Sequence, residues 1–148
     1  MTPLRLLVAL AALAGAVGWG ISALVMGQAG RIVPVPSLAP ITMWMLAVAL
    51  LGWTLLARPR LLRQPGSRPM PPLLAARTAA LAMAGSRTGA LIGGFYAGVL
   101  LAVIPRTETE TGLSTLWAAA LTVAASILLI VVALWLERLC QLPARDDG

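Results

Sequence analysis

Long apolar stretches alternate with short polar connections along the whole chain. Four apolar runs occur, at residues 6–26, 35–57, 84–104 and 113–136. A bilayer core about 30 Å thick needs about 20 helical residues, because each residue of an α-helix rises about 1.5 Å. Each run is long enough for one crossing, although the second is short because only residues 41–57 follow its last proline. The pattern therefore predicts four transmembrane helices.

Three of the predicted helices extend beyond their apolar runs, and the second begins within its run. We expect them at about residues 4–27, 38–57, 73–104 and 113–140, with Pro40 in the first turn of the second. The first run is longer than the apolar core of a signal peptide, so we expect it to be retained as a helix.

The remaining segments are too short for a second domain, so residues 1–148 are predicted to form one polytopic membrane domain. Residues 58–72 are rich in proline and arginine and are expected to form an extended cytoplasmic loop. Residues 141–148 are expected to form a cytoplasmic tail. The predicted fold is an all-α membrane protein with four transmembrane helices in an antiparallel bundle.

Composition supports this interpretation. Hydrophobic residues make up 59% of the 148 positions and charged residues only 11%. Charged residues make up about 25% of a typical soluble domain. The chain is therefore expected to be an integral membrane protein.

Arginines indicate the orientation, because loops rich in basic residues remain in the cytoplasm. Eight arginines precede the first apolar run, separate the second run from the third, or follow the fourth: Arg5, Arg58, Arg60, Arg63, Arg68, Arg77, Arg138 and Arg145. The other two connections contain Arg31 and Arg106 alone. Both termini and the middle loop are predicted to be cytoplasmic, in a multi-pass protein of the cytoplasmic (inner) cell membrane.

The net charge of +6 bears on partners. The arginines mark membrane edges and no basic-aromatic binding module occurs, so we expect no nucleic acid. We expect the lipid bilayer as a partner, with anionic headgroups near residues 58–77, where each arginine could contribute about 1 kcal/mol. A homo-oligomer or another membrane protein remains a further candidate partner.

Glycines recur at four-residue spacing in the third helix. Gly85, Gly89 and Gly93 form one row, and Gly94 and Gly98 form a second. Such spacing removes side chains from one helix face and lets another helix backbone approach closely. A close-packed interface is predicted, filled by the first or fourth helix of the chain or by another subunit. On the first helix, a small-residue stripe makes that helix one candidate: Ala14, Gly18 and Ser22.

Arg87 lies among these glycines. It is either an anchor at the membrane surface, with its charge reaching the lipid headgroups, or one half of an ion pair. The candidate partner is Glu137, the only carboxylate near the inner end of a helix. A second candidate contact at depth is a hydrogen bond between Tyr96 and the hydroxyls of Thr122 or Ser126.

The sequence lacks the residue types that most catalytic and metal sites require. The chain has no histidine and one cysteine, Cys140, and its carboxylates other than Glu137 lie in loops or the tail. We therefore expect no catalytic site, no metal, no cofactor and no enzyme activity.

The order of elements resembles a family of small actinobacterial membrane proteins known only as a domain of unknown function. The resemblance is carried by Gly18-Trp19, by the block from Arg77 to Gly94, and by the ending from Glu137 to Asp147. It singles out positions that recur in similar surroundings: Arg77, Ala84, Arg87, Gly89, Glu137, Cys140 and Pro143. It implies no activity, and only a genomic context near folate-biosynthesis genes.

The sequence thus favours a structural or accessory membrane subunit that packs through a glycine-lined helix. The alternative is a small transporter or channel component for an anionic solute, with Arg87 and Tyr96 lining its path.

Overall fold

Four long helices make up most of the chain in a computed structural model that describes residues 3–30, 36, 38–62, 71–106 and 108–140. The elements are α1 (Leu4–Ala29), α2 (Leu38–Leu61), α3 (Pro72–Val103), the short 3-10 helix η1 (Ile104–Arg106) and α4 (Glu110–Cys140). No strand occurs in these residues, and all four long helices are long and apolar enough to cross a membrane. The predicted all-α membrane fold is confirmed.

Three helices are longer than the sequence suggested, α1 by two residues at its end. α2 continues through Pro59 to Leu61, because a proline so close to the end removes only one helical hydrogen bond. α4 begins at Glu110, where Thr109 caps its first turn: the Gly112 N–H donates to Thr109 Oγ1 at 3.1 Å. The middle of the predicted loop, residues 63–70, and the predicted tail, residues 141–148, lie outside the described residues.

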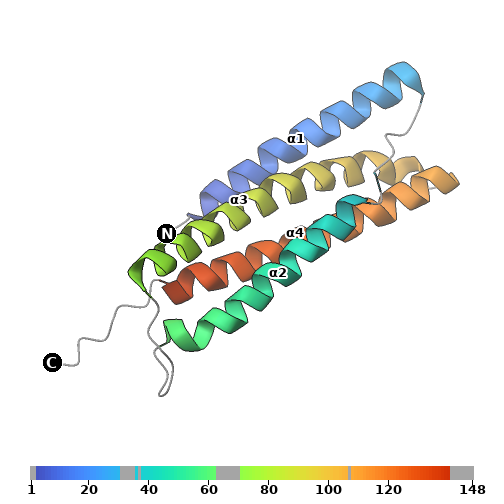
Figure 1. Ribbon diagram of the computed structural model, residues 1–148. Coiled ribbons are helices and arrows are strands. Elements are labelled where there is room, and N and C mark those ends of the chain that lie inside the picture. Colours follow the sequence, from blue (N-terminus) through green and yellow to red (C-terminus); the bar gives the residue numbers. More distant parts are fainter. Residues whose placement is uncertain (1–2, 31–35, 37, 63–70, 107, 141–148) are drawn as a thin grey trace.

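The helices form a row in which α1 packs against α3, α3 against α4, and α4 against α2 (Figure 1). Consecutive helices run in opposite directions, as predicted, so α3 and α4 are antiparallel neighbours. The side-by-side pairs α1–α3 and α2–α4 are parallel as a consequence (Figure 1). In the described part of the chain, α1 and α2 do not pack against each other although they are consecutive.

One end of the row is rich in arginine. The starts of α1 and α3 and the ends of α2 and α4 lie there together (Figure 1). These helix ends contain five arginines whose positions the structure describes: Arg5, Arg58, Arg60, Arg77 and Arg138. The arrangement is the one that the predicted cytoplasmic orientation requires, and the orientation itself stays a prediction.

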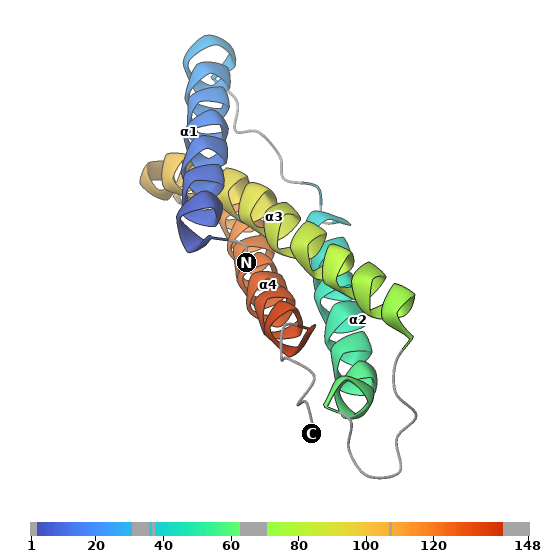
Figure 2. The same cartoon turned by 90° about the vertical axis from the view of Figure 1, so that its left-hand side faces the viewer.

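Burial is uneven across the row. Among the four membrane-length helices α4 is the most buried and α1 the least. The apolar core lies where α2 and α4 meet, around Met43, Leu50, Leu129 and Leu136. α1 crosses α3 obliquely at the edge of the molecule (Figure 2), so most of its surface faces outward.

Candidate functional site

The glycines of α3 face two different helices. Residues four apart lie on one face of a helix, whereas consecutive residues are separated by about 100°, so the two glycine rows adjoin around α3. Gly89 and Gly93 face α4, Gly85 lies near both Leu50 of α2 and Ala133 of α4, and Gly94 and Gly98 face α1. α3 therefore contacts a helix on each of two neighbouring sides.

On the α4 side, glycine leaves room for side chains. A Cβ atom added at Gly93 would lie 2.8 Å from the Ser126 Cβ, and one added at Gly89 would lie 2.8 Å from the Ile130 Cγ1. Both distances are shorter than real Cβ contacts. A Cβ at Gly85 would meet nearby side chains at 3.3 Å or more, so this position has more room.

On the α1 side, backbone meets backbone. A Cβ atom added at Gly94 would lie 2.7 Å from the Ala11 Cα and closer still to the carbonyl oxygen of that residue. One added at Gly98 would lie 2.8 Å from the Trp19 nitrogen and would overlap the carbonyl oxygen of Gly15. Backbone atoms cannot rotate aside as a side chain can, so these are the tighter contacts.

The small residues of α1 complete this interface. A Cβ at Gly18 would overlap the carbonyl oxygen of Phe95, and Ser22 is only 2% exposed. Ala14 of the predicted stripe is half-buried, and Gly15 next to it makes the close contacts instead.

Two buried hydroxyls of α4 donate hydrogen bonds within their own helix. Thr122 donates to the carbonyl of Ala118 at 2.8 Å, and Ser126 donates to the carbonyl of Thr122 at 2.8 Å. Tyr96 is half-buried, and its ring lies edge-on to that of Phe95 with centroids 5.5 Å apart. The structure therefore brings Thr122 and Ser126 together, and a bond from Tyr96 to either hydroxyl stays a prediction.

Arg87 and Glu137 differ in their surroundings. Glu137 is buried on α4, with 6% of its surface exposed, whereas the Arg87 side chain is exposed. Arg87 is also two residues from both Gly85 and Gly89, which places it on the side of α3 opposite to α4. The geometry therefore favours an Arg87 side chain that reaches the lipid headgroups at the membrane surface. The ion pair with Glu137 stays a prediction.

The packing register gives the same result. Gly85 faces Ala133 across the antiparallel α3–α4 pair, so Arg87 is level with residue 131 and Glu137 lies six residues further along. Six helical residues span about 9 Å. On the α1 side of α3, the facing pairs Ala11–Gly94 and Gly15–Gly98 put Arg87 close to level with the start of α1. Thermal unfolding of Glu137→Gln in detergent tests the pair, because an unchanged stability would exclude it.

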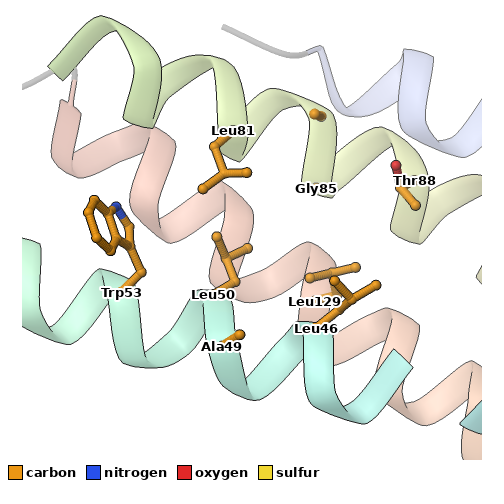
Figure 3. A pocket seen from close by; sticks show the side chains of 9 residues that line it. Leu46, Ala49, Leu50, Trp53, Leu81, Gly85, Thr88 and Leu129 are labelled. Carbon is orange, nitrogen blue, oxygen red and sulfur yellow. The ribbon is translucent and has the colours of Figure 1, made fainter. Parts of the chain in front are cut away.

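An apolar groove lies between α2 and α3. Its walls are formed by these two helices and its floor by Leu129 of α4 (Figure 3), and its volume is about 480 Å³. The wall residues are Leu46, Ala49, Leu50, Trp53, Leu81, Ala84, Gly85 and Thr88. A second groove between α1 and α3 is lined by Leu10, Leu13, Ala14, Val17, Leu91, Ile92, Phe95 and Tyr96. Arg87 lines neither of these two grooves.

Comparison with known families gives one match. A family model described as "Protein of unknown function (DUF3180)" matches residues 7–144. The chain belongs to the DUF3180 family. The match spans all four helices of the DUF3180 protein and confirms the resemblance to a family without an assigned activity, whereas an actinobacterial source stays a prediction. No curated protein and no solved structure matches the chain.

One contact in this DUF3180 protein could not be inferred from the sequence. The guanidinium carbon of Arg58 lies 5.8 Å from the centre of the Trp135 ring, a cation–π contact between the arginine-rich ends of α2 and α4. In the sequence, Arg58 directly follows the second apolar run and Trp135 is at the end of the fourth. Only the parallel packing of α2 on α4 brings them together.

The described residues of the DUF3180 protein contain no cluster of three His, Cys, Asp or Glu side chains that could hold a metal ion. The surfaces they do present are exposed apolar helix faces, apolar grooves, and arginines at one end. These surfaces are suited to binding helices and lipid.

Proposed function

We propose that the DUF3180 protein is a structural or accessory subunit of an assembly in the cytoplasmic membrane, built around its glycine-lined third helix. It is an integral membrane protein with four apolar helices, and its family has no assigned activity. The observation that carries the proposal is the close contact of α3 with helices on two sides, at Gly93 with α4 and at Gly98 with α1. Such packing favours a rigid scaffold.

The polar groups inside the protein also support this role. Among the described residues, the buried hydroxyls of Thr54, Thr78, Ser86, Thr122 and Ser126 donate to carbonyls of their own helices. A transport path needs polar groups that face water or solute. Hydroxyls already bonded within a helix are less available for that purpose.

The transporter alternative depends on Arg87 and Tyr96. The Arg87 side chain is exposed but lines neither groove, while Tyr96 lines the groove between α1 and α3. The two residues therefore do not share either groove, and the alternative has less support than the structural role.

The outer face of α1 is the first place to look for a partner. A Cβ atom at Gly20 or Gly27 would meet nothing within 4 Å, and α1 is the least buried helix. Close approach of another transmembrane helix to these glycines is sterically possible.

Purification from native membranes tests the proposal. The tagged protein is extracted in mild detergent, and co-purifying membrane proteins are quantified by mass spectrometry. We expect one membrane protein at fixed stoichiometry, and a several-fold lower yield of it with the double variant Gly20→Leu/Gly27→Leu. Gly52→Leu, at an open glycine of α2, is the matched control and is expected to retain the partner. If the chain purifies alone and as a monomer, even after cross-linking in intact membranes, the accessory role is wrong.

A further inference from the structure

The groove between α2 and α3 is a lateral opening in the row of helices. α2 packs on α4 and not closely on α3, so the two walls are separated and Leu129 of α4 lies between them (Figure 3). Its wall residues Leu46, Trp53 and Leu81 are 52%, 46% and 50% exposed. A groove of about 480 Å³ is within the size range of small-molecule sites, and its exposed apolar walls suit a hydrocarbon chain.

Each wall of the groove continues toward an arginine. On α3, Arg77 precedes Leu81 by four residues, and on α2, Arg60 follows Trp53 by seven. Both spacings keep the arginine on the same helix face as the groove residue. Both arginines are exposed, and both lie toward the end of the row where α2 ends and α3 begins.

The two arginines are also close to the same depth. Leu50 contacts the position of Gly85, since a Cβ atom added there would lie 3.3 Å from the Leu50 Cδ2. α2 and α3 run in opposite directions, so Arg60 lies ten residues and Arg77 eight residues from this contact, both toward the same end. The difference of two residues is about 3 Å along the helices.

The length of this surface matches one leaflet. Leu46 and Arg60 are separated by 14 residues of α2, or about 21 Å. One leaflet is about 20–22 Å thick when its headgroups are included. A lipid with its phosphate at the arginines would therefore have its acyl chain in the apolar groove.

We propose that this groove is a binding site for one anionic phospholipid, with an acyl chain between α2 and α3 and its phosphate between Arg60 and Arg77. The charge of the two arginines favours an anionic over a zwitterionic lipid. Arg58 differs from this pair because its guanidinium lies over Trp135 of α4. The lipid site does not depend on the proposed subunit role, since it needs only this chain and the bilayer.

Native mass spectrometry of the full chain, released from detergent, tests the site. The delipidated protein is titrated with dioleoyl phosphatidylglycerol and, separately, with dioleoyl phosphatidylcholine, which has the same chains. We expect one phosphatidylglycerol to bind more tightly than phosphatidylcholine. Arg60→Gln/Arg77→Gln is expected to weaken that binding about thirtyfold, given two headgroup contacts of about equal strength.

Matched variants separate this site from general lipid coating. Arg5→Gln/Arg138→Gln removes two exposed arginines outside the groove and is expected to leave the affinity unchanged. Ala84→Phe fills the groove and should abolish the bound lipid, whereas Ala12→Phe, at an exposed alanine of α1 that lines neither groove, should not. Circular dichroism melting verifies that each variant is folded.

The proposal is overturned by any of three results. Equal affinity for the two lipids, or equal loss with the control arginine pair, means a nonspecific annulus. A dimer that forms without bound lipid and is lost in Ala84→Phe means that a second copy of the chain fills the groove.

Discussion

At Gly98 the backbones of α1 and α3 meet with no side chain between them. A Cβ atom there would overlap the Gly15 carbonyl oxygen and lie 2.8 Å from the Trp19 nitrogen. Because both neighbours are backbone atoms, the only relief is a shift of a whole helix. The absence of one methyl group therefore sets the separation of two helices.

We predict that Gly98→Ala destabilises the protein by about 1–3 kcal/mol, the range for overpacking a tight contact. Gly20→Ala is the control, since a Cβ atom at Gly20 meets nothing within 4 Å and alanine is the better helix former. Thermal unfolding in detergent measures both. Equal melting temperatures for the two variants would contradict the contact.

The accessibility of position 87 to water distinguishes a structural role of Arg87 from a role in a transport path. In a Cys140→Ser background, Arg87→Cys is treated with membrane-impermeant thiol reagents from each side of the membrane. Arg87 is close to level with the start of α1, at the end of the row that is predicted to be cytoplasmic, so we expect labelling from the cytoplasmic side only or not at all. Labelling from both sides would favour the transport path over the structural role.

At the scale of elements, the ends of the helices show what a sequence pattern can miss. α4 starts at Glu110 because Thr109 accepts a hydrogen bond from the Gly112 N–H, and Glu110 then places a negative charge in the first turn. The apolar run alone suggested a start three residues later. Threonine directly before a glutamate is typical of a helix N-terminus, so the local sequence could have predicted the start of α4 at Glu110.

Removal of this cap is expected to cost about 1 kcal/mol of stability. Thr109→Ala removes the oxygen that accepts from the Gly112 N–H at 3.1 Å. Thr111→Ala, at the second residue of α4, is the control, because Thr111 accepts from the Ser114 hydroxyl through its backbone carbonyl, which alanine keeps. Thermal unfolding would refute the cap if the two variants lost equal stability.

At the scale of the whole molecule, the order of the helices across the row differs from their order in the chain. α3 lies between α1 and α4, and α2 lies on the far side of α4 (Figure 1). α1 and α2, which form the first helical hairpin, therefore do not pack against each other over their described residues. α3 and α4, which form the second hairpin, lie between them.

Cysteine cross-linking tests this order in the Cys140→Ser background. Leu13→Cys with Leu91→Cys joins α1 to α3 across the groove that both residues line, so we expect efficient coupling by a short bifunctional thiol reagent. Leu13→Cys with Val48→Cys pairs α1 with α2, which do not pack together, and we expect none. Cross-linking of the second pair within a monomer would refute the row.

The sequence by itself determined that the chain crosses a membrane four times and which residues of α3 can lie close to another helix. Both follow from local physical requirements: a run of about 20 apolar residues to span the core, and glycine where backbones meet. The tertiary structure decided which helix occupies each face of α3, that Arg58 meets Trp135, and that a groove opens between α2 and α3. A small-residue face fits several helices equally well, so its partner is fixed only when all four helices pack together.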